Sequence, residues 1–290
     1  MADGGEGTLE ALGGANRTTT VTGPLGDPVE APWRLDRRTA VVEMARASGL
    51  ALVGGAAGND PIAAATHGTG ELIAAALDAG ARRVLIAVGG SATTDGGLGA
   101  LRALYPLQRL RAAELIVACD VRTTFIDAAE RFAPQKGASA AQVELLRRRL
   151  ERLAQVYRDE HDVDVTELEG GGAAGGLAGG LAAVGAVLEP GFDLVAEELD
   201  LVAVLEGADL VITGEGFLDE QSFEGKVVGG VADLAGEVGV PVLAIAGEVF
   251  DGCGDRVETV SLMERFGQER SHQDTLACVT EAVADRLQRL

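Results

Sequence analysis

Three continuous apolar runs, each ending in glycine or polar residues, constrain the fold of this chain more than any other feature. They are VLIAVGG at 84–90, LIVACDV at 115–121 and VPVLAIAGEV at 240–249. The first two runs are typical of a strand that is buried on both faces of a parallel sheet, and the third predicts a strand that leads into a loop. Helical patterns occupy 69–82, 139–157 and 272–290. Strands that alternate with helices predict an α/β fold with parallel sheets.

Other segments refine this picture. Residues 18–44 alternate β-branched residues with turn signals, which predicts antiparallel strands, and 208–216 and 256–263 read as further strands. Ser139 is a suitable N-cap for the helix that follows it. GGGAAGGLAGGLAAVGAVL at 170–188 carries no charge, but it is mostly Gly and Ala and has acidic flanks. We therefore expect a glycine-rich loop entering a tightly packed helix rather than a membrane span.

Composition excludes some classes of partner. A net charge of −21 argues against nucleic acid, because phosphate backbones need a basic surface. An anionic small molecule is still compatible with this charge if backbone N–H groups and a few local cations hold it. The start, MADGGEGT, does not have the pattern of a signal peptide. Cys119, Cys253 and Cys278 lack metal spacing and are expected to be buried thiols in a reducing cytoplasm.

Candidate ligand loops follow the predicted strands, and ligands of parallel sheets bind beyond the carboxyl ends of the strands. GGSATTDGG at 89–97 offers backbone N–H groups for phosphate or carboxylate oxygens. In it Asp95 could bind Mg²⁺ or orient a hydroxyl; the alternative is a tight turn with Asp95 near a helix cap. GEGFLDEQSFEGK at 214–226 combines carboxylates with one cation, which suits a Mg²⁺–phosphate site, with a solvated loop as the alternative.

The two lysines are unusual. Of 24 basic residues, 22 are arginine, and Lys136 and Lys226 both directly neighbour glycine. Lysine is a compact charge on a flexible stem, so both are candidates for contacts to phosphate, with chance as the alternative. Weaker candidates are Asp120 at a strand end, Gln135 before a helix, and His67 beside glycine. The Walker A loop, the dinucleotide fingerprint and a Ser–His–Asp triad cannot be assigned.

Taken in order, these segments resemble the bacterial type I glycerate kinases. The matching motifs are ADGGEGT, VTGPLGDPVEA, THGTGELI, VGGSATTDGGLGAL, VACDV, APQKGAS, GGGAAGGLAGGL, ADLVITGEG and LDEQSFEGK. The resemblance implies transfer of the γ-phosphoryl group of ATP to D-glycerate with Mg²⁺, with the 2-hydroxyl favoured over the 3-hydroxyl. It also implies two α/β lobes, residues 1–205 and a Rossmann-like lobe at 206–290, with the active site in the cleft between them.

The resemblance further implies the site residues. The implied catalytic residues are Asp95, Asp120, Lys136, Glu215 and Lys226, with Asp95 and Glu215 as Mg²⁺ ligands. The implied substrate- or ATP-binding residues are Asp3, Gly4, Gly5, Glu6, Thr8, His67, Gly89, Gly90, Ser91, Thr93, Gln135, Gly214, Asp219, Gln221 and Ser222. Partners are small molecules, with no nucleic acid or membrane, and the oligomeric state is open.

Three departures from the family pattern keep an alternative open. The strand–helix–strand that usually precedes ADGGEGT is absent, so we expect the Rossmann-like lobe to lack its opening strands. The connection ALRALYPLQRLRAAELIVACDV is tens of residues shorter than expected, and Phe217 replaces the family's arginine. Either the chain starts downstream of the true start, or it is a degenerate member that binds glycerate or nucleotide without turnover.

Overall fold

A computed structural model describes residues 1–223, 226–250 and 256–289. The chain forms two compact units, Met1–Val195 and Ala196–Leu290. This division comes earlier than the boundary expected after residue 205. Helix α9 (Leu201–Glu206) explains the difference, because its buried Leu205 packs against Ala235 and Val242 of the second unit.

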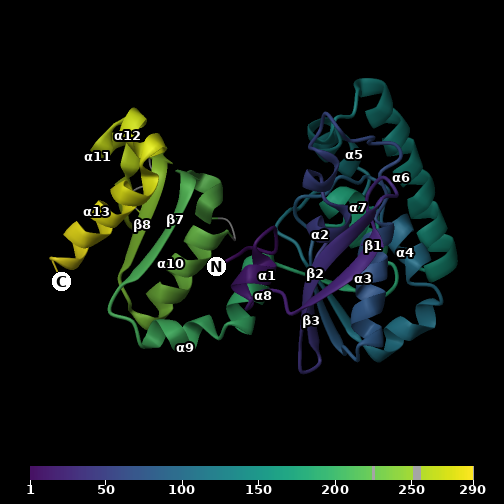
Figure 1. Cartoon of the computed structure of the whole chain (residues 1–290), viewed down its shortest axis with the longest axis horizontal. Coiled ribbons are helices and arrows are strands. Elements are labelled where there is room, and N and C mark those ends of the chain that lie inside the picture. The colour runs from purple at the N-terminus through teal and green to yellow at the C-terminus, as the bar shows by residue number, and fades with distance from the viewer. Residues whose placement is uncertain (224–225, 251–255, 290) are drawn as a thin grey trace. The chain divides into compact units, whose positions relative to one another are not determined.

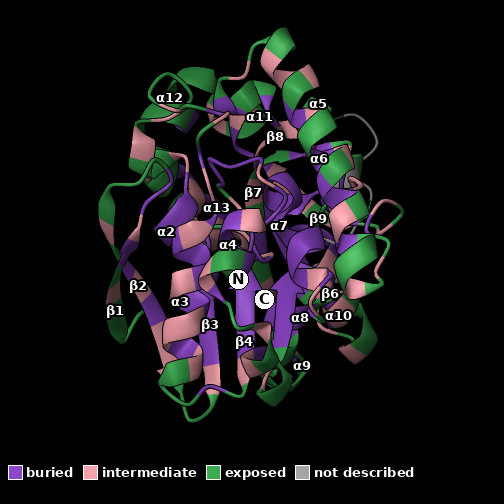
Figure 2. Ribbon diagram, turned by 90° about the vertical axis from the view of Figure 1, so that its right-hand side faces the viewer, coloured by how far each residue is buried: buried purple, intermediate pink, exposed green. Residues whose placement is uncertain are grey.

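The first unit is built on one mixed sheet. Its strands are β1 (Arg17–Thr22), β2 (Pro28–Asp36), β3 (Thr39–Glu43), β4 (Arg83–Ala87), β5 (Glu114–Ala118) and β6 (Val187–Glu189), in this order across the sheet. β1, β2 and β3 are antiparallel neighbours, as predicted from the turn signals. β3 to β6 run parallel, so the apolar runs predicted as buried parallel strands are confirmed. Figure 2 shows β3 and β4 buried beneath helices.

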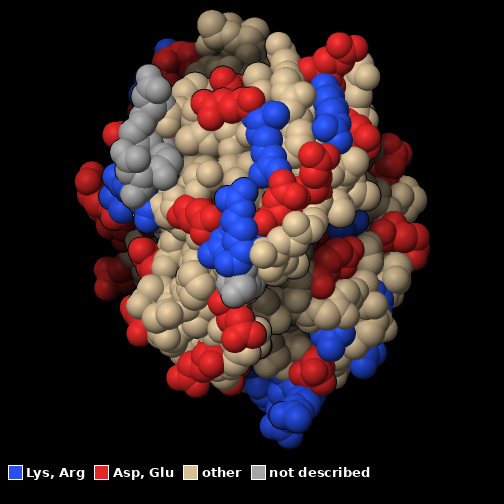
Figure 3. All heavy atoms as spheres, turned by 90° about the vertical axis from the view of Figure 1, so that its left-hand side faces the viewer, with Lys and Arg blue, Asp and Glu red and all other residues tan. Residues whose placement is uncertain are grey.

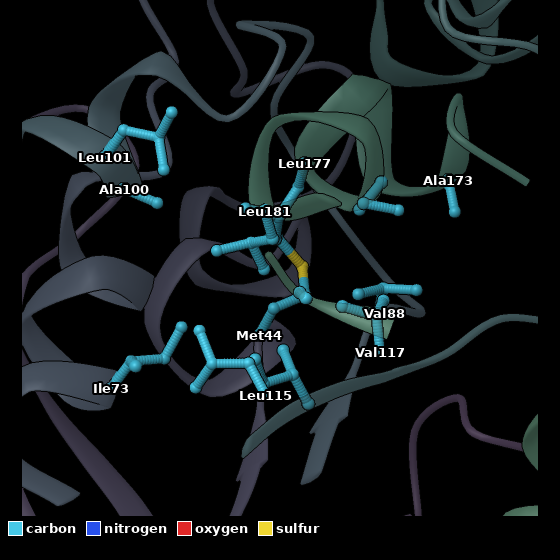
Figure 4. Packing of buried hydrophobic residues seen from close by; sticks show 14 of the residues in the cluster. Met44, Ile73, Val88, Ala100, Leu101, Leu115, Val117, Ala173, Leu177 and Leu181 are labelled. Atoms are coloured by element: carbon cyan, nitrogen blue, oxygen red, sulfur yellow. The ribbon is translucent and has the colours of Figure 1, made fainter. Parts of the chain in front are cut away.

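Helices cover both faces of the parallel strands. They are α1 (Thr8–Ala11), α2 (Ala45–Ser48), α3 (His67–Asp78), α4 (Leu98–Ala103), α5 (Ala128–Phe132), α6 (Ala140–His161), α7 (Ala173–Ala182) and α8 (Gly191–Glu198). The strand period of two sends neighbouring residues to opposite faces. Val42 joins the large core, which includes Ile73 and Leu101 (Figure 4), whereas Val41 joins a smaller cluster with Leu9 of α1 and Leu194 of α8.

Two helices carry sequence features that were predicted to matter. Ser139 accepts a hydrogen bond from Gln142 N, and the Gln142 side chain accepts one from Ser139 N, so a capping box starts α6. α7 is buried, and its glycines allow close packing: a Cβ on Gly176 would lie 2.8 Å from Gly96 Cα. The predicted packed helix is confirmed, but Ala174, Gly175 and Gly176 have left-handed φ/ψ angles, so the helix is interrupted by a kink near its start. The described residues contain no helix long and apolar enough to cross a membrane.

The second unit is a smaller α/β layer structure. Its sheet is parallel in the order β7 (Val211–Leu218), β8 (Val242–Val249) and β9 (Glu258–Ser261). Its other helices are α10 (Val227–Val238), α11 (Leu262–Phe266), α12 (Gln268–Gln273) and α13 (Thr275–Leu287). Val228 of α10 packs on one face of the sheet and Cys278 of α13 on the other, an arrangement visible in Figure 1. The prediction of βα units in the last third is confirmed.

The surface mixes charges of both signs. Figure 3 shows acidic and basic side chains interspersed on one face. In the second unit, Arg270 pairs with Glu281 at 2.8 Å, and Arg286 pairs with Glu258 at 2.8 Å. Two of the three cysteines are free thiols: Cys278 is buried, as predicted, and Cys119 is partly buried. Cys253 lies outside the described residues.

Candidate functional site

A cavity of about 450 Å³ lies at the carboxyl ends of β4 and β5 in the first unit. Segments that are far apart in the sequence meet there. Nine of the predicted site residues line it: Asp3, Gly4, Gly5, Gly89, Gly90, Ser91, Asp120, Gln135 and Lys136. Ala173 and Ala174 of the buried α7 complete one wall. The position agrees with the general rule that parallel sheets bind ligands beyond the carboxyl ends of their strands.

The N-terminal segment is fixed in place by Glu43, at the carboxyl end of β3. This carboxylate is 1% exposed, and its Oε1 accepts hydrogen bonds from Gly7 N at 2.9 Å and Leu9 N at 2.8 Å. Arg46 Nε donates to its other oxygen at 2.9 Å, so the buried charge is compensated. Val88 N also donates to Gly4 O at 3.1 Å. The segment that sequence alone would leave as a loose terminus therefore forms a packed wall of the cavity.

Two glycines allow this close approach of backbones. Gly4 has φ of +88°, and a Cβ there would lie 2.6 Å from Ala118 Cβ. A Cβ on Gly89 would lie 2.8 Å from Gly5 Cα. Neither position has space for a side chain, because the neighbouring atoms are backbone or a Cβ. Glycine at these two positions therefore allows the N-terminal segment to pack against the end of β5 and against the loop after β4.

Lys136 is the central cation of the cavity. It ends the short turn Pro134–Lys136, is 2% exposed, and donates from Nζ to Ser91 Oγ at 2.7 Å and to Thr93 O at 2.6 Å. Burial lowers the pKa of Lys136 to about 7, and the charge of Asp95 acts against this fall. A lysine with such a pKa can change its charge near neutral pH, so it can hold an anion or exchange a proton.

Asn59 supports Lys136, although no sequence pattern identifies it as a site residue. Its Nδ2 donates to Ala92 O at 3.0 Å and to Lys136 O at 2.9 Å, so one side chain ties the loop after β4 to the turn that carries the lysine. Its Oδ1 is buried and has no partner among the described residues. A lone asparagine in VGGAAGND gives no periodic or motif signal, and only the fold shows what it connects.

Asp120 lines the cavity, and its Oδ1 accepts a hydrogen bond from Gly191 N at 2.7 Å, at the start of α8. Although the residue as a whole is exposed, desolvation of the carboxylate raises the pKa of Asp120 to about 6. The nearby Asp3 carboxylate adds to the rise, and the Gly191 N–H opposes it. Such a carboxylate is mostly ionised at pH 7 but basic enough to accept a proton.

Asp95 is occupied within its own turn. Its Oδ2 accepts from Thr66 N and Thr66 Oγ1, both at 2.9 Å, and from Gly99 N at 3.0 Å, while Oδ1 accepts from Gly97 N at 3.2 Å. It lines a different cavity from the one that holds Lys136. This geometry fits the alternative interpretation, a capped strand-to-helix turn, and the Mg²⁺ role of Asp95 stays a prediction.

The remaining predicted residues of the first unit have varied surroundings. Thr8 Oγ1 donates to Gly5 O at 2.8 Å and stabilises the N-terminal turn. Glu6 is exposed and lies against Gly90, where a Cβ would be 2.4 Å from Glu6 Oε1. Thr93 is fully buried and contributes its carbonyl to Lys136. His67 starts α3 and lies 3.5 Å from Glu71 Oε1.

The predicted residues of the second unit follow β7. Gly214 and Glu215 lie on the strand itself, and Glu215 Oε1 is buried without a partner among the described residues. Asp219 and Ser222 form a local turn, in which Ser222 Oγ accepts from Asp219 N at 3.0 Å. Lys226 precedes α10 as its N-cap residue and is partly buried. The side chain of Gln221 lies outside the described part of the chain.

Comparison with known proteins agrees with these features. A family model described as "Glycerate kinase family" matches residues 1–105 and 106–289. A relative named "Glycerate 2-kinase" from Escherichia coli (strain K12) is 41% identical over 292 residues, covering 88% of this chain and 76% of the relative. A "Glycerate kinase" from Bacillus subtilis (strain 168) is 42% identical over 287 residues, covering 86% and 75%.

A solved structure extends the likeness to the fold. The crystal structure, named as a glycerate kinase 2 from Salmonella typhimurium LT2, superposes with a TM-score of 0.76 at 36% identity, covering 99% of this chain and 88% of that one. The family model spans the residues that line the cavity, including its lysine and its glycine loops. The chain therefore belongs to the glycerate kinase family.

Proposed function

We propose that this kinase phosphorylates D-glycerate with ATP as donor, at the 2-hydroxyl. The observation that carries the proposal is the convergence of Asp3, Ser91, Asp120 and Lys136 on one cavity at the strand ends. The relatives with glycerate kinase names support the substrate, and the Escherichia coli relative supports the 2-position by its name. A cytoplasmic location, expected from the cysteines and the start of the sequence, belongs to the same proposal.

The residues that line the cavity can act on two groups of such a substrate, its carboxylate and its hydroxyl. A small hydroxy acid needs its carboxylate neutralised and its hydroxyl oriented. Backbone N–H groups of the glycine loops and the Lys136 ammonium can hold the anionic oxygens, and Asp120 can accept the hydroxyl proton. The hydroxyl oxygen then forms a bond to the γ-phosphorus of ATP, the bond to the β–γ bridging oxygen breaks, and ADP leaves with that electron pair.

Mg²⁺ is proposed with ATP, since it neutralises phosphoryl charge during transfer. Glu215 fits a role as its ligand, because its Oε1 is buried with no partner in the described residues and Mg²⁺ is often held by one or two carboxylates plus substrate phosphates. Asp95 fits less well, because both of its oxygens already accept backbone N–H groups. Lys226, beside α10, is proposed to contact phosphate oxygens.

The direct test is to incubate the purified chain with ATP, Mg²⁺ and D-glycerate and to follow the products by phosphorus NMR. We expect ADP and 2-phosphoglycerate to form together. Formation of 3-phosphoglycerate would keep the kinase and change the position. A folded chain that binds D-glycerate but never consumes ATP would contradict the proposal and support a binding protein without turnover.

A further inference from the structure

A second, larger groove lies on the first unit between α4 and α6, with a volume of about 1170 Å³. Its floor and walls are mostly apolar, and its rim carries arginines. The apolar lining comes chiefly from Ile62, Leu98, Leu101, Leu107, Leu153 and Val156. This groove is separate from the cavity that holds Lys136, and the proposed function gives it no role.

The groove lies beside the point at which the family match divides. The family match is divided between Tyr105 and Pro106, and Tyr105 lines the groove with 75% of its surface exposed. The alignment with the Escherichia coli relative spans 292 residues, whereas 88% of this 290-residue chain is about 255 residues. The relative therefore carries about 37 residues more within the aligned region. The family match therefore divides at the edge of this apolar groove.

The rim of the groove is positively charged in a chain whose net charge is −21. Arg149 Nη1 donates to Ile62 O at 3.0 Å, and Arg152 Nη1 donates to Gln155 Oε1 at 2.9 Å. No hydrogen bond or ion pair within residues 1–223, 226–250 and 256–289 occupies the Arg102 guanidinium. None of these three arginines is paired with a carboxylate of the described residues. A fourth lining arginine, Arg148, pairs with Glu144 at 2.9 Å, and Asp95 and Glu160 are the acidic lining residues. The rim can therefore accept an added negative charge.

We propose that this groove binds an amphipathic monocarboxylate, with its alkyl chain along the apolar walls and its carboxylate on the arginine rim. Burial of an alkyl chain contributes free energy for each methylene group, and a guanidinium presents paired N–H donors that match a carboxylate. This inference goes beyond the proposed function and does not depend on it.

The groove also borders the loop after β4, which holds Lys136 in the smaller cavity. Thr94 and Asp95 line the groove, while Thr93, the residue before them, accepts a hydrogen bond from Lys136. Thr94 Oγ1 is buried without a partner in the described part of the chain. A ligand in the groove therefore lies one residue away from a hydrogen bond that positions the central lysine.

The chain contains a natural probe for this site. Its two tyrosines, Tyr105 and Tyr157, both line the groove. We would label the tyrosine rings with ¹³C and titrate the full chain with octanoate, using 1-octanol as the uncharged control. We expect both sets of ring signals to shift and saturate with octanoate, and 1-octanol to bind about tenfold or more weakly, since the loss of one good charge contact has that size.

Arg102→Ala tests the rim, and Arg38→Ala is the matched control, because Arg38 is an exposed arginine in the turn between β2 and β3. We expect Arg102→Ala to weaken octanoate binding several-fold while Arg38→Ala leaves it unchanged, with circular dichroism verifying the fold of both. Absence of saturable tyrosine shifts, equal binding of octanoate and 1-octanol, or binding only of an acidic amphipathic peptide would overturn the proposal. These readouts require no kinase turnover, so they are independent of the proposed function.

Discussion

Lys136 Nζ lies 2.7 Å from Ser91 Oγ, so the buried cation of the turn before α6 is hydrogen-bonded directly to the glycine loop after β4. The two residues are 45 positions apart in the sequence. The contact joins two of the predicted ligand loops into one structure. The contact also holds in place a lysine whose pKa is lowered to about 7, so the charge of Lys136 can be varied in experiments near neutral pH.

Replacement of Lys136 by Met should change the pH dependence of stability. The folded-state pKa of about 7 lies below the ordinary value of 10.5, so the unfolded chain holds the extra proton between these pH values. Stability of the parent should therefore rise with pH across this window, by on the order of 1 kcal/mol per pH unit from this group. Below pH 7 the cost of the buried charge is fully present. The measurement is urea unfolding of both proteins at pH 6, 7.5 and 9.

The difference between the two proteins isolates Lys136 from the other titrating groups. We expect the free energy of unfolding of Lys136→Met to exceed that of the parent by the largest margin at pH 6, and this margin to shrink as the pH rises. A difference that stays constant over the three pH values would contradict a lowered pKa. The same variant should lose about tenfold or more in kcat/KM, because it keeps the volume of the side chain but not its charge.

Asn59→Ala should reduce catalysis as well as stability. It removes the two hydrogen bonds that hold Ala92 O and Lys136 O, and the unpaired carbonyls should cost about 1–3 kcal/mol. Asn16→Ala is a matched control, because Asn16 also makes two hydrogen bonds to backbone, both to Leu35. We expect only Asn59→Ala to lower kcat/KM. Equal kcat/KM for the two variants would show that Asn59 does not position Lys136.

Gly89→Ala should displace the N-terminal wall of the cavity. The added Cβ would lie 2.8 Å from Gly5 Cα, so the backbone must shift, at a cost of about 1–3 kcal/mol. Gly236→Ala is the control, since nothing lies within 4 Å of its Cβ position and alanine is favoured inside a helix by up to about 1 kcal/mol. Thermal unfolding and the KM for D-glycerate measure both effects. A Gly89→Ala protein with parental KM would argue against a role of this wall in binding.

Much of the fold could be predicted because its signals are local. Continuous apolar runs predicted β4, β5 and β8, and Ser139 predicted the start of α6. The division at residue 195 could not be predicted, because the place of α9 depends on the contact of Leu205 with Ala235 and Val242. The packing of Glu43 under the N-terminal segment is likewise a contact between residues that no short pattern connects.

Part of the site could be predicted as well, because its signals are also local. Glycine loops, a strand-end aspartate and a rare lysine have recognisable composition, and they meet in one cavity. Sequence alone could not separate a carboxylate that faces a ligand from one that caps a turn. Asp120 lines the cavity, and its pKa is raised to about 6. Both carboxylate oxygens of Asp95, in contrast, accept hydrogen bonds from Thr66, Gly97 and Gly99. Only the three-dimensional arrangement distinguishes these two uses.

Glu215→Gln should weaken the response of the enzyme to Mg²⁺. The substitution keeps the shape of the side chain but removes the charge from the buried, unpartnered Oε1. We expect the Mg²⁺ concentration for half-maximal activity to rise about tenfold or more, as for loss of a carboxylate ligand. Glu206→Gln, at the end of α9, is a control acidic residue outside β7. An unchanged Mg²⁺ response in Glu215→Gln would exclude this carboxylate as a ligand.

Lys226→Ala should lower kcat/KM for ATP by about tenfold or more, since loss of an important charge contact to a phosphate has that magnitude. Lys226 is partly buried and is the N-cap residue of α10, and the N-terminus of a helix favours a bound anion. Lys226→Arg keeps the charge but replaces a compact ammonium by a planar fork, so we expect partial recovery. Steady-state kinetics with varied ATP at saturating D-glycerate gives all three values. A catalytic efficiency of Lys226→Ala within about twofold of the parent would remove this lysine from the proposed phosphate contacts.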